Sequence, residues 1–293
     1  MSMEELAEQK DRGHRLGLFL LFLICGISLP ALSGLLVFPF SLIPPGMEPV
    51  YRIGLFIVFL SSTIFSHRND RFKKYWQVLF AFFVASFAIF VDSFIGTFLN
   101  LQATTMNVMV LDMLSSTLLI VIPIIVLTRI SGARVASIFL KKGNLKLGLI
   151  IGLTGFFVFA IVSVQGAKYL FLGQNLSLER VIPWTPWILV TVMVNGLREE
   201  LLYRGLFLKK YEPLLGSNSS NLLQAMIFSL SHTVAGFGTV TYTQFPTVFV
   251  IITFLLGLAW GYVMQRTDSL LGPVLFHAGS DIPIFIGRFS NLP

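Results

Sequence analysis

The feature that most constrains this chain is a succession of long apolar segments separated by short polar ones. A helix needs about 20 apolar residues to cross the hydrocarbon core of a bilayer. Because lipid offers no partners for backbone polar groups, such segments span as helices. We therefore predict an all-α fold, a polytopic transmembrane helix bundle with about eight or nine membrane helices. The candidate spans are 16–38, 53–65, 76–99, 108–130, 147–172, 186–207, 222–235, 247–264 and 270–287, of which the second and seventh look short.

The composition excludes a soluble domain. Apolar residues make up 55% of the chain and charged residues only 12%, whereas soluble domains carry about 25% charged residues. The net charge of +7 comes from basic residues in short loops between apolar segments, so it does not indicate nucleic-acid binding. The single cysteine, Cys25, lies in an apolar segment, which excludes a disulfide framework and a cysteine-based zinc site.

The distribution of basic residues predicts the orientation. With a cytoplasmic N-terminus, the inside segments hold most of the lysines and arginines, leaving aside Arg198 and Arg204 within the sixth segment. We expect a multi-pass integral membrane protein with its N-terminus in the cytoplasm and a retained first helix rather than a cleaved signal peptide. A Gly/Thr-rich outside loop is expected at 236–244. The chain is expected to form one membrane domain, with N-terminal helices in 1–146 and a catalytic bundle in 147–293.

Ionisable residues gather inside the C-terminal apolar segments. Such residues are costly within a membrane and usually functional. The sixth segment holds two glutamates and an arginine, the seventh a histidine, and the ninth a histidine and an aspartate; they are Glu199, Glu200, Arg204, His232, His277 and Asp281. Asp112, in the fourth segment, is expected to be interfacial. Asp92, in the third, is expected to make a helix–helix hydrogen bond or to reach the site.

Helical spacing separates the two adjacent glutamates. Glu200 and Arg204 are four residues apart, so they share a helix face and can pair. Glu199 points about 100° away from Glu200, on the face that Asn195 shares. Glu199 therefore lacks an ideally placed cation and is a candidate general base.

The two histidines lie on other helices. His232 is expected in the middle of an apolar helix, and Asp281 follows His277 by one turn, where it can accept a hydrogen bond and fix the ring tautomer. Taken singly, these motifs also suit interfacial charges, a hydrogen-bonded core histidine or a structural pair. Together they can hold a water, deprotonate it and stabilise an oxyanion, as amide hydrolysis requires.

Three motifs in this order resemble those of the CPBP family, the intramembrane peptidases related to type II CAAX prenyl endopeptidases and to bacteriocin-processing enzymes. The resemblance covers about residues 186–287 and rests on Glu199-Glu200-x-x-x-Arg204, Phe228-x-x-x-His232 and His277-x-x-x-Asp281. It implies an intramembrane endopeptidase that uses activated water to hydrolyse peptide bonds of a membrane-associated or lipidated protein or peptide. The expected partners are this substrate and the lipid bilayer, without nucleic acid, and the oligomeric state is left open.

The resemblance also implies residue roles. Glu199 would be the general base, and His232 would help to hold the water. Support would come from the Glu200–Arg204 pair, together with Asn195 and Phe228.

His277 and Asp281 would stabilise the oxyanion or orient the site. Asp281 stands where the eukaryotic CAAX enzymes have Asn, and an aspartate offers no amide donor. Orienting His277 is therefore the expected role of Asp281, and this motif form suggests a prokaryotic plasma membrane.

The sequence leaves alternatives for the cofactor and for the class of function. A metal would be Zn²⁺ held by Glu199, His232 and His277, but the His-Glu-x-x-His pattern is absent and an arginine lies near the glutamates. We favour a metal-free, glutamate-type peptidase with no cofactor over a metalloprotease. The rival functions are a proton-coupled transporter and a non-catalytic immunity or scaffold member of the same family.

Overall fold

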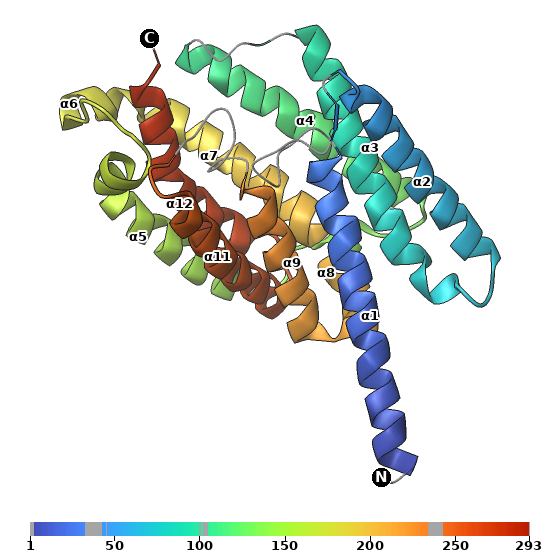
Figure 1. Ribbon diagram of the computed structural model, residues 1–293. Helices are drawn as coiled ribbons and strands as arrows, with labels where there is room; N and C mark the ends of the chain where they lie inside the picture. Colours follow the sequence, from blue (N-terminus) through green and yellow to red (C-terminus); the bar gives the residue numbers. More distant parts are fainter. Residues whose placement is uncertain are drawn as a thin grey trace.

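In the computed structural model, every regular element within the described residues is a helix (Figure 1). The described residues are 3–32, 43–44, 46–99, 101, 105–233 and 243–292. The helices are α1 (Met3–Ala31), α2 (Glu48–Arg68), η1 (Lys73–Tyr75), α3 (Trp76–Leu99), α4 (Met106–Ile130), η2 (Val135–Ile138), α5 (Leu145–Leu170), α6 (Leu178–Val181), η3 (Ile182–Trp184), α7 (Thr185–Glu199), η4 (Glu200–Gly205), α8 (Leu208–Leu215), α9 (Ser217–Ser231), α11 (Pro246–Thr267) and α12 (Leu271–Ser290).

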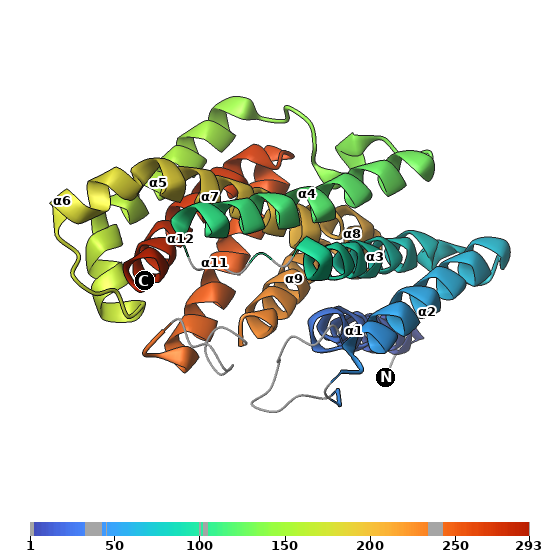
Figure 2. The ribbon, with the colours of Figure 1, turned by 90° about the horizontal axis from the view of Figure 1, so that it is seen from above.

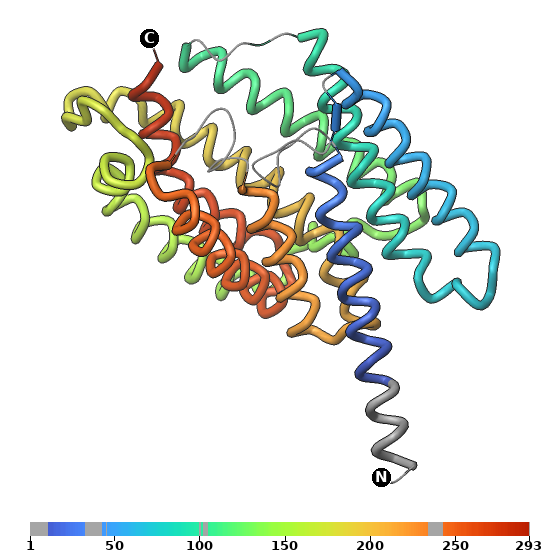
Figure 3. Tube along the Cα trace, in the orientation of Figure 1, coloured from blue at the N-terminus to red at the C-terminus, as the bar shows by residue number. Residues whose placement is uncertain are grey.

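Six of these helices are long and apolar enough to cross a membrane: α1 to α5 and α11. The helices α7 and α9 are shorter, with 15 residues each, and α12 carries His277, Asp281 and Arg288, which lower its hydropathy. The predicted all-α membrane helix bundle is confirmed, and the chain is an integral, multi-pass membrane protein. The described part of α1 runs beside α9, on which it packs (Figure 3).

Two of the predicted boundaries were wrong. The second segment is not short, because α2 continues through its polar ends and reaches 21 residues. The seventh is a 15-residue helix that begins earlier than predicted and ends at Ser231, a length of about 22 Å. Positions 33–38 of the first segment, 234–235 of the seventh and most of the 236–244 loop lie outside the described residues.

The sixth segment is also not one regular α-helix. It changes at Glu200 into η4, a π-helical turn. There the Leu206 N–H donates to the Leu201 carbonyl, five residues back, at 2.9 Å. Gly205 gives this wider turn room, because a Cβ there would lie 3.0 Å from the Ile138 carbonyl oxygen. Such turns occur frequently at functional sites.

The helices form two sides with α7 and α4 between them (Figure 2). On one side lie α1 to α3, and on the other lie α5, α11 and α12. The helix α12 packs along α5 and α7, α9 packs on α11 and α1, and α4 packs on α7. The N-terminal and C-terminal parts therefore share contacts, and the division near residue 146 stays a prediction.

Glycines allow α12 to lie directly against α5. A Cβ added to Gly152 would lie 2.8 Å from the Gly272 carbonyl oxygen, and one added to Gly279 would lie 2.4 Å from the Phe156 Cα. Small residues of this kind permit close backbone approach between membrane helices. This contact fixes the helix that carries two of the predicted site residues.

The loop before α5 contacts the turn that connects α11 to α12. The Asn144 N–H donates to the Thr267 carbonyl at 2.7 Å. Asp268, in the left-handed conformation at φ 50°, forms ion pairs with Lys141 and, at 2.7 Å, with Lys209. Partial burial raises the pKa of Asp268, but the hydrogen bonds and charges of Lys141 and Lys209 outweigh this effect. The pKa of Asp268 therefore lies below its ordinary value.

Candidate active site

Three elements bring a carboxylate and two imidazoles to one point. Glu199 is the last residue of α7, and its Oε2 lies 3.7 Å from the His232 Nε2 and 3.5 Å from the His277 Nε2. That oxygen is buried and has no hydrogen-bond partner among the described residues. A buried acceptor without a donor is costly, and here it faces two ring nitrogens. The predicted convergence of the Glu motif with both His motifs is present.

His232 occupies the C-cap of α9, not the middle of a helix as predicted. Its backbone N–H donates to the Ser229 carbonyl, three residues back. Its ring Nδ1 lies 2.8 Å from the Phe228 carbonyl oxygen, which can only accept a hydrogen bond. This contact assigns the proton to Nδ1, so that in the neutral ring Nε2 presents its lone pair toward Glu199.

The His277 ring is hydrogen-bonded to Glu200, whereas Asp281, its predicted partner, lies at ion-pair distance. The His277 Nδ1 lies 2.8 Å from the Glu200 Oε1. Asp281 Oδ1 lies 3.6 Å from the His277 Nε2, beyond hydrogen-bond distance. The ring also stacks on Trp260, with centroids 4.0 Å apart and an interplanar angle of 6°. The hydrogen bond to Glu200 thus fixes the rotation of the His277 ring within its own plane, and the stacking on Trp260 fixes the orientation of that plane.

The predicted Glu200–Arg204 pair is present and wholly buried. Arg204 Nη1 donates to Glu200 Oε1 at 2.5 Å, and neither side chain is exposed. The guanidinium carbon lies 4.4 Å from the Phe228 ring centroid and 5.0 Å from that of Trp260. Buried ion pairs need such additional contacts to offset the cost of desolvation. Phe228 supports the site through this contact and through its edge-on packing against His277.

Glu199 has a cation partner that the helical-spacing argument missed. Arg198 Nη2 lies 3.3 Å from the Glu199 Oε1 and 2.6 Å from the Asn195 Oδ1. Neighbours i and i+1 point in different directions on a helix, but the long arginine side chain bends back over its own turn. Asn195 in turn donates from Nδ2 to Asp281 Oδ2 at 2.8 Å, which makes Asn195 the residue that holds Asp281.

Two contributors were not singled out from the sequence. Arg198 directly precedes the glutamate motif, and a charged residue inside a predicted membrane span could have indicated a role in the site. Trp260 gave none, because one aromatic residue in an apolar segment is ordinary.

A cavity of about 140 Å³ adjoins the two histidines. His232, His277 and Asp281 form its polar wall. The remaining wall is mainly apolar and comes from α5, α9, α11 and α12: Phe159, Val162, Gly166, Leu170, Phe171, Phe228, Phe249, Ile252, Thr253, Leu256, Trp260, Ser280, Pro283 and Ile284. Val162, on the α5 side, is half exposed, which places the open side of the cavity at the outer surface of the helix bundle.

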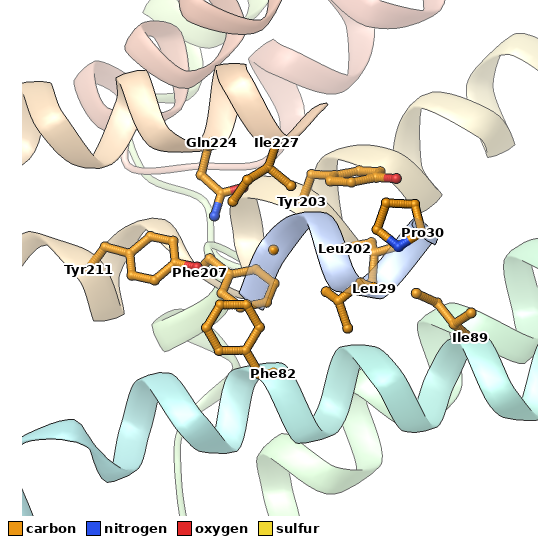
Figure 4. A pocket seen from close by; sticks show the side chains of 11 residues that line it. Leu29, Pro30, Phe82, Ile89, Leu202, Tyr203, Phe207, Tyr211, Gln224 and Ile227 are labelled. Carbon is orange, nitrogen blue, oxygen red and sulfur yellow. The ribbon is translucent and has the colours of Figure 1, made fainter. Parts of the chain in front are cut away.

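A second, smaller cavity lies on the other side of η4 (Figure 4). It measures about 20 Å³ and is enclosed by α1, α3, α8 and α9, room for about one water molecule. Leu202 and Tyr203 of η4 line it, together with Gln224 and Tyr211. None of its lining residues belongs to the carboxylate–imidazole set, so the larger cavity is the one associated with the site.

The donor set was also compared with metal centres. Among the described residues, no group of three or more His, Cys, Asp or Glu side chains has an arrangement suited to a metal ion. The cation that contacts Glu199 is the guanidinium of Arg198.

Comparison with known proteins agrees with the site. The family model described as type II CAAX prenyl endopeptidase Rce1-like matches residues 181–282, about a third of the chain. This stretch runs from just before α7 into α12 and contains every residue of the three motifs. No curated protein and no solved structure matches the chain. The matched stretch is therefore similar to this family of intramembrane proteases, and its three motifs converge on one buried site.

Proposed function

We propose that the protein is an intramembrane endopeptidase in which Glu199 and His232 activate a water molecule for attack on a peptide bond. One observation carries the proposal. The unpartnered Oε2 of Glu199 and the Nε2 atoms of His232 and His277 converge within 3.7 Å, beside a cavity that the histidines line. The family match supports the same class of reaction.

The hydrogen bonds around the site favour a water between Glu199 and His232. The neutral His232 ring, protonated at Nδ1, offers an acceptor at Nε2, and the Glu199 Oε2 is a second acceptor. A water that donates one hydrogen to each acceptor keeps an oxygen lone pair free. General-base activation needs this geometry, with the base in hydrogen-bond reach of the proton that it removes.

In the proposed reaction, the water oxygen forms a bond to the substrate carbonyl carbon while its proton passes to Glu199. The carbonyl π electrons move to the oxygen and produce a tetrahedral oxyanion. When the C–N bond breaks, Glu199 returns the proton to the leaving nitrogen. The C=O bond re-forms as the C–N bond breaks, so the products are a carboxylic acid, which keeps the second proton of the water, and an amine, and Glu199 is again ionised.

His277 suits stabilisation of the oxyanion. Its Nδ1 donates to Glu200, so in the doubly protonated ring Nε2 is a donor aimed at the same point as the catalytic pair. Three carboxylates, those of Glu199, Glu200 and Asp281, lie within 3.6 Å of its ring nitrogens. Donors held in place before the reaction stabilise developing charge without reorganisation.

The cavity favours a substrate that reaches the site from the membrane. Its wall between α5 and α11 is apolar, and its volume of about 140 Å³ is close to that of an engineered apolar cavity that binds benzene. We propose that a peptide held in or at the membrane, by an apolar segment or a lipid group, presents an apolar side chain here.

The test is cleavage by purified protein in lipid vesicles. Peptides carrying a membrane segment or a lipid anchor are incubated with wild type, His232→Ala and Asp112→Asn, and the products are identified by mass spectrometry. We expect wild type and Asp112→Asn to cleave at the same bond and His232→Ala to fail. If no peptide is cleaved and the vesicles show Glu199-dependent proton uptake, the peptidase proposal is wrong and the transporter alternative gains support.

A further inference from the structure

A line of polar contacts connects the N-terminal helices to the Glu199 carboxylate. We propose that Arg198 is a positioning residue for Glu199, and that Asp92 of α3 acts on the reaction by holding Arg198 through Ser116 of α4. The proposal rests on the peptidase function above. It assigns a catalytic contribution to Asp92 and Ser116, which lie outside the family-matched segment.

The contacts form an unbroken chain. Ser116 Oγ donates to Asp92 Oδ2 at 3.1 Å, and Arg198 Nη1 donates to Ser116 Oγ at 2.9 Å. The other guanidinium nitrogen, Nη2, reaches Asn195 Oδ1 at 2.6 Å and Glu199 Oε1 at 3.3 Å. One planar group thus ties α4 to the carboxylate of the proposed base.

The position of Arg198 fixes which oxygen of Glu199 is free. With Oε1 against the guanidinium, Oε2 points to the two histidines and stays without a hydrogen-bond partner. Without Arg198, the carboxylate could rotate about its terminal torsion, which is broad and roughly two-fold. Catalytic groups displaced by about 1 Å can lose about 100-fold in rate.

Asp92 adds a second negative charge near the Arg198 guanidinium, which already contacts the carboxylate of Glu199. The Arg198 side chain is only 19% exposed, and an arginine within a membrane bundle is stable mainly when it is paired. Asp92 also interacts electrostatically with Arg52 and Asp112, but the hydrogen-bonded route from Asp92 leads through Ser116 to Arg198. The predicted helix–helix hydrogen bond of Asp92 is therefore present, and it continues toward the site.

A helix–helix bond with no catalytic effect would produce the same contacts, so the test must separate the two roles. Asp92→Asn keeps an oxygen that can accept from Ser116 but removes the charge. Arg198→Gln removes the guanidinium, and Arg198→Lys keeps the charge but not the planar fork. Asp112→Asn is the matched control, because it makes the same chemical change one helical turn from Ser116 on an exposed position.

The experiment measures kcat, KM and thermal unfolding for these variants and for the double variant Asp92→Asn/Arg198→Gln. We expect Arg198→Gln to lower kcat about 100-fold with KM little changed, and Arg198→Lys to restore part of the loss. Asp92→Asn alone should lower kcat about tenfold or more, yet add no loss in the Arg198→Gln background, because linked residues are non-additive. Asp112→Asn should match wild type.

The opposing outcomes are distinct. If Asp92→Asn lowers the unfolding temperature but not kcat, the contact is structural only and the inference is overturned. Losses from Asp92→Asn and Arg198→Gln that simply multiply would also overturn it. An inactive wild type would instead sink the proposed function, whereas an active wild type with an unaffected Arg198→Gln sinks only this inference.

Discussion

The substitution Gly279→Ala should separate α12 from α5 and disable the site without touching a charged residue. The added Cβ would lie 2.4 Å from the Phe156 Cα and 3.0 Å from its carbonyl oxygen. Backbone atoms give way only if the helix moves, and carbon atoms pack at about 3.5–4.0 Å. The two helices must therefore separate by about 1 Å.

The magnitude of the effect follows from the position of His277, two residues before Gly279 on the same helix. Its Nδ1 lies 2.8 Å from the Glu200 Oε1, so a shift of about 1 Å stretches this contact beyond a hydrogen bond. We expect kcat to fall about 100-fold and stability to fall by about 1–3 kcal/mol, as in other overpacked interiors.

The assay is peptide cleavage together with thermal unfolding in the same detergent or lipid. Gly96→Ala is the matched control, because no atom of the described residues lies within 4 Å of its added Cβ and alanine is the better helix former. Its activity and unfolding temperature should equal or exceed those of wild type. If Gly279→Ala cleaves within threefold of wild type and unfolds at the same temperature, the close α5–α12 contact does not position His277.

Three further outcomes follow from the same geometry. Trp260→Leu removes the indole stacked on His277, so it should lower the free energy of unfolding by about 2 kcal/mol and reduce kcat. Trp260→Phe keeps an aromatic ring and should be affected less. If wild type and both variants have the same kcat, the stacking on His277 plays no part in the reaction. Chelators should leave cleavage unchanged, and purified active protein should contain far less than one equivalent of zinc; activity that is lost to chelation and restored by Zn²⁺ would favour the metalloprotease alternative. Asp268→Asn keeps a residue that tolerates positive φ but loses the ion pairs with Lys141 and Lys209. Because the folded pKa of Asp268 is lowered, wild type should unfold at a higher temperature than this variant near neutral pH, and the difference should disappear as the pH falls through that pKa; a pH-independent difference would argue against the ion pairs.

Much of the fold was accessible from hydropathy, because the bilayer requires long helices whose backbone bonds are internal. The predicted third segment, 76–99, has the bounds of α3. What hydropathy could not give was the end of α9 at Ser231 or the π-turn at Glu200. Both depend on contacts that the hydrophobic pattern does not encode, such as the hydrogen bond between the His232 ring and the Phe228 carbonyl at the end of α9.

The site was predictable to the extent that its contacts are local. The Glu200–Arg204 pair follows from a spacing of four residues and is present. The partner of His277 was assigned to Asp281 by the same rule, but Glu200, 77 residues away in the sequence, takes that place. Spacing within one helix does not reveal which side chains a neighbouring helix places beside a residue, and here that helix supplies the carboxylate of Glu200.

The central claim is that Glu199 is the general base. Its most direct test is the single-turnover rate constant of Glu199→Gln on a cleaved peptide, compared with Glu179→Gln, an exposed glutamate in α6. Glutamine keeps the size of the side chain and removes its basicity, so we expect a loss of about 100-fold to 10,000-fold, with substrate binding retained and Glu179→Gln equal to wild type. A Glu199→Gln rate constant within tenfold of wild type would contradict the account.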